Sequence, residues 1–152
     1  MAQEPTLPNN SENEPRPTTA RLMRMLESSP NQFRERHLPN AKAPVFHEYL
    51  YGLMEKRQVS VPELITRACI SKTYAYQFIN GERLPGRDII LRIALAMQLS
   101  MDETQRLLTL AGKAVLYPKI RRDASVLYCL KKKMTLDETN SFLEDLGEVT
   151  LL

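Results

Sequence analysis

Apolar residues recur at three- and four-residue spacing from position 44 onward, which is the period of an amphipathic helix. The first such face consists of Phe46, Leu50, Leu53 and Met54. Pro44 suits a first helical position because it lacks an amide hydrogen, so this helix is predicted to run from Pro44 to about Gln58. No stretch beyond it alternates apolar and polar residues as a strand would, and the pattern predicts an all-helical domain.

Capping residues predict the next two helices. Ser60 and Glu63 have the spacing of a capping box, in which the hydroxyl and the carboxylate each satisfy a free amide. The helix that follows is predicted to reach about Ala68. Ser71 can cap a third helix over 72–79, and a turn of three residues separates the two helices.

Two further helices complete the predicted five-helix domain over 44–112. Asp88 introduces a helix over 89–98, and Ser100 with Glu103 has the spacing of a second capping box. Gly112 is the type of residue that ends a helix in the left-handed conformation, so the fifth helix is predicted to stop there.

The remainder of the chain repeats the last two of these helices. Shifted by 35 residues, RRDASVLYCLKKKMTLDETNSFLEDLG (121–147) aligns with GRDIILRIALAMQLSMDETQRLLTLAG (86–112). The matches include Arg87 with Arg122, Asp88 with Asp123, the two Asp-Glu-Thr triplets, the capping pair Thr135 with Glu138, and the terminal Gly147. The repeat predicts a two-helix C-terminal hairpin over 113–152 that stacks on the first. The residues predicted to stack are Val126, Leu130, Leu136, Phe142 and Leu143.

Residues 1–43 differ from the rest of the chain in composition. Six of the ten prolines lie before residue 41, among Asn, Ser, Thr and Glu, and such a segment buries too little apolar area to order itself. A flexible N-terminal arm is therefore predicted. Leu22, Met25 and Leu26 have helical spacing, so residues 20–28 are either a short helix or a fraying tail.

The net charge of +3 comes from one segment. Residues 41–99 hold eight Lys and Arg against five Asp and Glu, whereas the charges balance on either side of them. A local positive excess is what a phosphate-facing surface requires.

Membrane and redox signals are weak in this sequence. No apolar run approaches the length of a membrane helix, and the N-terminus lacks the pattern of a signal peptide, which predicts a cytoplasmic protein with no membrane partner. The two cysteines, Cys69 and Cys129, cannot form a metal cluster or a disulfide framework, and both are interpreted as small core residues.

The segment VPELITRACISKTYAYQFINGERLP, from Val61 to Pro85, resembles the helix-turn-helix core of lambda-repressor-like (XRE-type) regulators. The resemblance rests on Leu64, the turn Cys69-Ile70-Ser71, Phe78, Asn80-Gly81 with Arg83 and Pro85, and Ile93-Ala94. It implies the fold of that family over 44–112. The sequence departs from the family pattern at Ile65, where a small residue is usual, at Cys69, where glycine is usual, and at Ala75, where a bulky aliphatic is usual.

The resemblance also implies a DNA-binding surface. In such a motif the second helix braces the third, which lies in the major groove with the residues near its front at base edges. Lys72, Thr73, Tyr74 and Gln77 are the residues expected at base edges. Ser71, Tyr76, Asn80 and Arg83 are expected at phosphates.

The leading hypothesis is a sequence-specific transcriptional regulator that binds double-stranded DNA. A homodimer or a protein partner would use the C-terminal hairpin or the N-terminal arm. The alternative is a protein-interaction adaptor that keeps the fold without binding DNA, because two tyrosines on the third helix suit a protein interface. No cofactor, metal or catalysis is expected, since His47 has no second histidine or cysteine nearby in sequence and His37 lies in the N-terminal arm. No glycine-rich phosphate loop is present either.

Overall fold

Helices account for all the regular structure that the computed structural model describes, which covers residues 19–20, 23–24 and 44–152. Residues 44–152 form one compact unit. Its helices are α3 (Phe46–Arg57), α4 (Val61–Ala68), α5 (Lys72–Ile79), α6 (Arg87–Ala96), α7 (Met101–Leu110), α8 (Arg121–Lys131) and α9 (Leu136–Asp145). No strand occurs in these described residues, which confirms the all-helical fold class for them.

The predicted N-terminal helix and flexible arm lie almost wholly outside the described residues. Thr19, Ala20, Met23 and Arg24 are helical, and the rest of the segment 1–43 is not described.

Side-chain caps start most of the later helices, as the sequence predicts. Ser60 and Ser71 each accept a hydrogen bond from the backbone amide three residues on, at 3.3 Å. Among the helices from α3 to α9, only α7 has the whole capping box, because the Ser100 amide also donates to the Glu103 carboxylate at 2.9 Å. The full box predicted at Ser60 is wrong, since Glu63 pairs instead with Arg67 one helical turn further on, at 3.5 Å.

Two helix starts differ from the prediction. The first helix begins at Phe46 with Val45 as its extended cap, two residues after Pro44. The helix predicted from Ile89 begins at Arg87 and ends at Ala96, which places Asp88 in its first turn rather than before it. A carboxylate in the first turn is favourable because it faces the positive end of the helix dipole.

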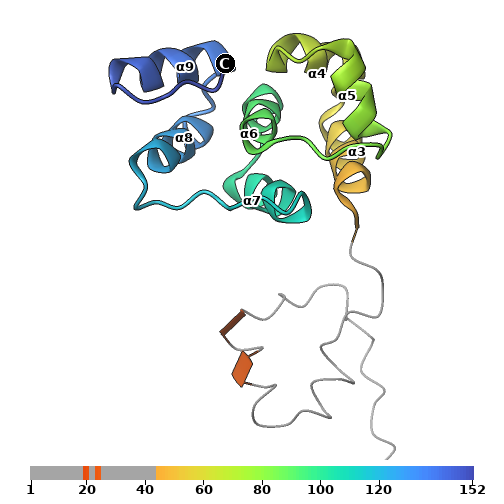
Figure 1. Cartoon of the computed structure of the whole chain (residues 1–152), viewed down its shortest axis with the longest axis horizontal. Coiled ribbons are helices and arrows are strands. Elements are labelled where there is room, and N and C mark those ends of the chain that lie inside the picture. The colour runs from red at the N-terminus through yellow and green to blue at the C-terminus, as the bar shows by residue number, and fades with distance from the viewer. Residues whose placement is uncertain (1–18, 21–22, 25–43) are drawn as a thin grey trace, which may run out of the picture. The chain divides into compact units, whose positions relative to one another are not determined.

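The core is built around α6, which lies between two groups of helices (Figure 1). On one side α6 packs against α4, and on the other it packs against α8 and α9. Its side chains Ile90, Leu91, Ile93, Ala94 and Leu95 are buried, as an apolar helix in this position requires. α5 lies at the outer edge, beside α3 and α4.

The helices α6 and α7 form the first hairpin, and the helices α8 and α9 form the second hairpin. Of the residues predicted to stack the second on the first, Val126, Leu130, Leu136 and Leu143 are buried. Phe142 is half-buried: it packs against the edge of the core, and its ring stacks on that of Tyr128 with the ring centroids 5.3 Å apart.

Candidate nucleic-acid interface

α5 has an anchored face and an open face. Ala75 and Phe78 point into the core and are fully buried. The opposite side of the helix carries Lys72, Thr73, Tyr76 and Gln77, whose spacing places them on one face of the helix. These four residues form the outer stripe. Lys72, Thr73 and Tyr76 are exposed and Gln77 is half-buried. Within residues 44–152, no hydrogen bond or ion pair engages any of these four side chains.

Tyr74 and Arg83 are held against each other on the flank of α5. The Tyr74 ring meets Phe78 edge to face, with the centroids 5.6 Å apart, and is half-buried. The Arg83 guanidinium lies 5.2 Å from the centroid of the Tyr74 ring, within the range of a cation–π contact. The sequence prediction groups Tyr74 with Lys72 and Thr73, whereas the structure brings it together with Arg83.

The turn before α5 contains a capping residue, Ser71, and an exposed residue in the left-handed conformation, Cys69. The Ser71 hydroxyl caps α5 by accepting from the Tyr74 amide, so this predicted phosphate contact already has a structural role. Cys69 adopts the left-handed conformation, with φ of 53°, where a residue with no side chain would be unstrained. The prediction that Cys69 is a core residue is wrong: it is exposed, because the helix has ended and the turn carries its side chain outward, whereas Cys129 is buried as predicted.

Arg92 of α6 fixes the position of this turn, and the sequence reasoning missed it. Its Nε donates to the Ala68 carbonyl oxygen at 2.9 Å, and its Nη2 donates to the Cys69 carbonyl oxygen. These carbonyls belong to the free end of α4, which a cation stabilises. The signal for it in the sequence is one arginine within the apolar run from Ile89 to Ala96 of α6.

The end of α5 is held close to α3. Asn80 is exposed, and Gly81 has φ of 79°. A Cβ on Gly81 would lie 2.7 Å from the His47 imidazole, so both the conformation and the close approach favour glycine. His47 therefore packs against the end of α5. Among the described residues, no three His, Cys, Asp or Glu side chains are grouped to hold a metal ion.

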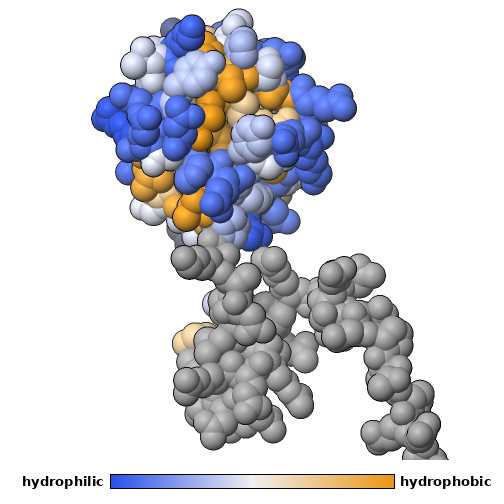
Figure 2. Space-filling view, turned by 90° about the vertical axis from the view of Figure 1, so that its right-hand side faces the viewer, coloured by the Kyte–Doolittle hydropathy of each residue, from blue (hydrophilic) through white to orange (hydrophobic). Residues whose placement is uncertain are grey.

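The surface formed by α3, α4 and α5 is predominantly polar. Figure 2 views it from the side on which α3, α4 and α5 lie, and hydrophilic residues surround a seam of apolar ones. Such a mixture is compatible with a wet, charged partner such as a duplex.

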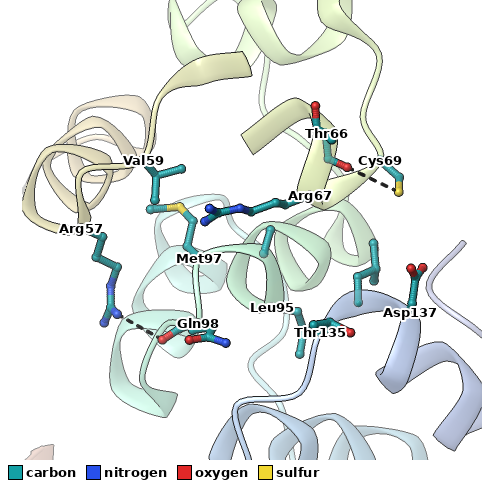
Figure 3. A pocket seen from close by; sticks show the side chains of 12 residues that line it. Arg57, Val59, Thr66, Arg67, Cys69, Leu95, Met97, Gln98, Thr135 and Asp137 are labelled. Atoms are coloured by element: carbon teal, nitrogen blue, oxygen red, sulfur yellow. Dashed lines mark hydrogen bonds between the residues drawn. The ribbon is translucent and has the colours of Figure 1, made fainter. Parts of the chain in front are cut away.

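A hollow of about 790 Å³ lies elsewhere, between the ends of α4 and α6 and the start of α9 (Figure 3). Its volume falls in the range of small-molecule sites. Two of its charged lining residues already have partners, because Arg57 bonds Glu103 and the Gln98 carbonyl oxygen and Arg67 pairs with Glu63. The third, Asp137, is exposed and forms no ion pair within residues 44–152. None of the predicted DNA-contacting residues lines it.

Comparisons of this chain with protein-family models, with curated proteins and with solved structures find no match. None of the described helices is both long enough and apolar enough to cross a lipid bilayer.

Proposed function

We propose that the chain is a sequence-specific, double-stranded DNA-binding regulator in which α4 and α5 form a helix-turn-helix of the XRE type. The observation that carries this proposal is the open face of α5. A helix with its inner side anchored by Ala75 and Phe78, and its outer side unengaged by described residues, has the form that the major groove admits.

The outer stripe supplies suitable chemistry for base edges. Lys72 can donate to the acceptors of guanine, the Thr73 methyl can contact the methyl of thymine, and the Gln77 amide matches the donor and acceptor of adenine. Tyr76 and Asn80 are exposed further along the same face, where hydroxyl and amide groups bond phosphate oxygens.

Positioning supports the same proposal. A reading helix must be held rigidly, since a small displacement loses the directional bonds to base edges. Ser71 caps its start, Arg92 fixes the turn before it, and the contact between His47 and Gly81 holds its end. Three separate elements, α3, α4 and α6, thus contribute to the orientation of α5.

The adaptor alternative loses part of its support. It depends on two tyrosines on α5, and only Tyr76 is exposed, with 39% of its surface accessible. Tyr74 is half-buried beneath Arg83, so the aromatic area offered to a protein partner is small.

Selection of bound duplexes from a random pool, followed by titration of the enriched sequence at several salt concentrations, tests the proposal. We expect one sequence to be enriched, and its association constant to fall with salt at a log-log slope of about −0.9 for each phosphate contact. Substituting Lys72→Ala or Gln77→Ala should weaken binding about tenfold or more, because each removes a base contact.

Lys119→Ala is the matched control. Lys119 is exposed in the link between α7 and α8, so the variant loses the same charge away from α5 and should stay within about twofold of the parent. Circular dichroism melting must show that all variants remain folded. Failure to enrich any sequence, or equal losses for Lys72→Ala and Lys119→Ala, would contradict the proposal.

A further inference from the structure

The two hairpins are joined by ion pairs that are reciprocal under the 35-residue shift. Arg87 of the first hairpin bonds both carboxylate oxygens of Asp123, at 3.0 and 2.8 Å. Arg122 of the second hairpin bonds both oxygens of Asp88, at 3.0 Å each. Arg87 is the counterpart of Arg122 in the repeat, and Asp88 is the counterpart of Asp123. The arginine of each hairpin therefore binds the equivalent aspartate of the other hairpin.

The same arginines repeat a second set of bonds. The Nε of Arg87 donates to the carbonyl oxygen of Ala114 at 2.9 Å, and the Nε of Arg122 donates to that of Val149 at 2.8 Å. Ala114 and Val149 are again 35 residues apart. The second amino groups reach the following carbonyls, of Val115 and Thr150.

A third reciprocal contact lies at the left-handed residues that end α6 and α8. The Gln98 side chain donates to the Lys133 carbonyl oxygen at 3.2 Å, and the Lys133 side chain donates to the Gln98 carbonyl oxygen at 2.9 Å. Their φ angles are 51° and 57°. Mutual contacts between equivalent residues are the defining property of a two-fold, self-complementary interface.

This two-fold relation does not extend to the rest of the described unit. α3, α4 and α5 occur once beside the first hairpin, and no described residues form a counterpart beside the second. The inner surface of the first hairpin is already covered, since α6 contacts α8 and α9, and α7 contacts α8. A second chain would need that surface to pair in the same way.

We infer that the second hairpin takes, within one chain, the place of a second subunit, so that the protein binds a single asymmetric DNA site as a monomer. This inference rests on the proposed function for its DNA part. A two-fold dimer would instead bind two half-sites about one helical turn apart. The partner that the first hairpin fits is a copy of itself, and the chain already carries that copy.

Light scattering on the full chain after size exclusion tests the subunit part without DNA. We expect the mass of one chain, 17.5 kDa, at all concentrations used for DNA binding. A stable mass of two chains overturns the inference. Failure of the proposed function leaves this measurement unaffected.

Duplexes that carry the enriched sequence once, or twice as an inverted repeat, test the DNA part. We expect one chain on the single site, and two chains on the inverted repeat that bind independently with a Hill coefficient of one. Cooperative binding of two chains, or enrichment of an inverted repeat from the random pool, overturns the inference. A monomer that enriches no sequence at all overturns instead the proposed function.

Discussion

The two hairpins share their sequence pattern and their mutual contacts but differ in how deeply those contacts are buried. The Asp123 side chain is 4% exposed, whereas its counterpart Asp88 is 45% exposed. Asp123 also accepts a bond from the Tyr117 amide at 3.0 Å, and no described amide does the same for Asp88. Equivalent residues in a duplicated element therefore carry unequal energetic weight, because the chain around them differs.

The largest difference between the hairpins is expected at these aspartates. Asp123→Ala should lower the free energy of unfolding by about 3 kcal/mol, because it removes a buried carboxylate that bonds both Arg87 and the Tyr117 amide. Asp88→Ala removes a more exposed carboxylate and should lower it by about 1 kcal/mol. Urea denaturation of both variants measures the two losses, and equal losses would show that burial does not distinguish the pairs.

The pH dependence of stability provides a second test of the contribution of Asp123. Burial opposes the ionisation of Asp123, yet bonds from Arg87 and the Tyr117 amide hold its pKa below the ordinary value for aspartate. A depressed pKa contributes stability above the ordinary pKa, near pH 4, and this stability is lost as the pH falls through the folded value. The parent should therefore lose stability below about pH 4, and Asp123→Ala should lose less over the same range.

The next largest difference in stability is expected between substitutions of Glu103 and of its counterpart Glu138, each three residues after a helix cap. Burial alone would raise the pKa of Glu103. The carboxylate accepts hydrogen bonds from the Ser100 amide and from Arg57, and these bonds outweigh burial and hold the pKa below the ordinary value for glutamate. Glu103→Gln should therefore cost about 2 kcal/mol. Its counterpart Glu138 is exposed, and its one side-chain bond within residues 44–152 is to the Thr135 cap, so Glu138→Gln should cost at most about 0.5 kcal/mol. Thermal melting of both variants checks this order.

A smaller effect is expected at the turn before α5, which lies outside both hairpins. Cys69→Gly should raise the free energy of unfolding by about 1 kcal/mol, because glycine adopts the left-handed conformation without strain. The thiol makes only a long contact, of 3.8 Å, to the Thr66 carbonyl oxygen, so little is lost. A decrease in stability on urea denaturation would mean that the side chain contributes more than its contacts indicate.

The smallest effect is expected where the hairpins are most alike. Gln98→Gly and Lys133→Gly each relieve the same backbone strain and each lose one of the reciprocal bonds. The two terms nearly cancel, so both variants should stay within about 0.5 kcal/mol of the parent. A difference between the two variants larger than this would break the equivalence of the hairpins at this point.

The helices were predictable from the sequence because their signals are local. Ser71 and Ser100 lie at the cap of the helix that each predicts, and Gly112 has the left-handed conformation expected at a helix end. The repeat was visible for the same reason, since its matches include the caps. The alignment does not tell whether Arg87 pairs with its neighbour Asp88 or with Asp123 of the other copy, because that choice depends on how the hairpins pack.

The candidate interface was predictable in outline only. Helical spacing separates the inner residues Ala75 and Phe78 from the outer stripe. Spacing did not reveal that Arg83 lies over Tyr74, because the two residues belong to different segments. It also missed Arg92, whose role depends on the approach of α6 to the end of α4, a distance that no local pattern encodes.

The arginine and aspartate contacts between the hairpins connect two parts of one polypeptide, and dilution cannot separate what a tether holds at millimolar effective concentration. A protein that pairs in this way has the same form when a cell makes few copies as when it makes many.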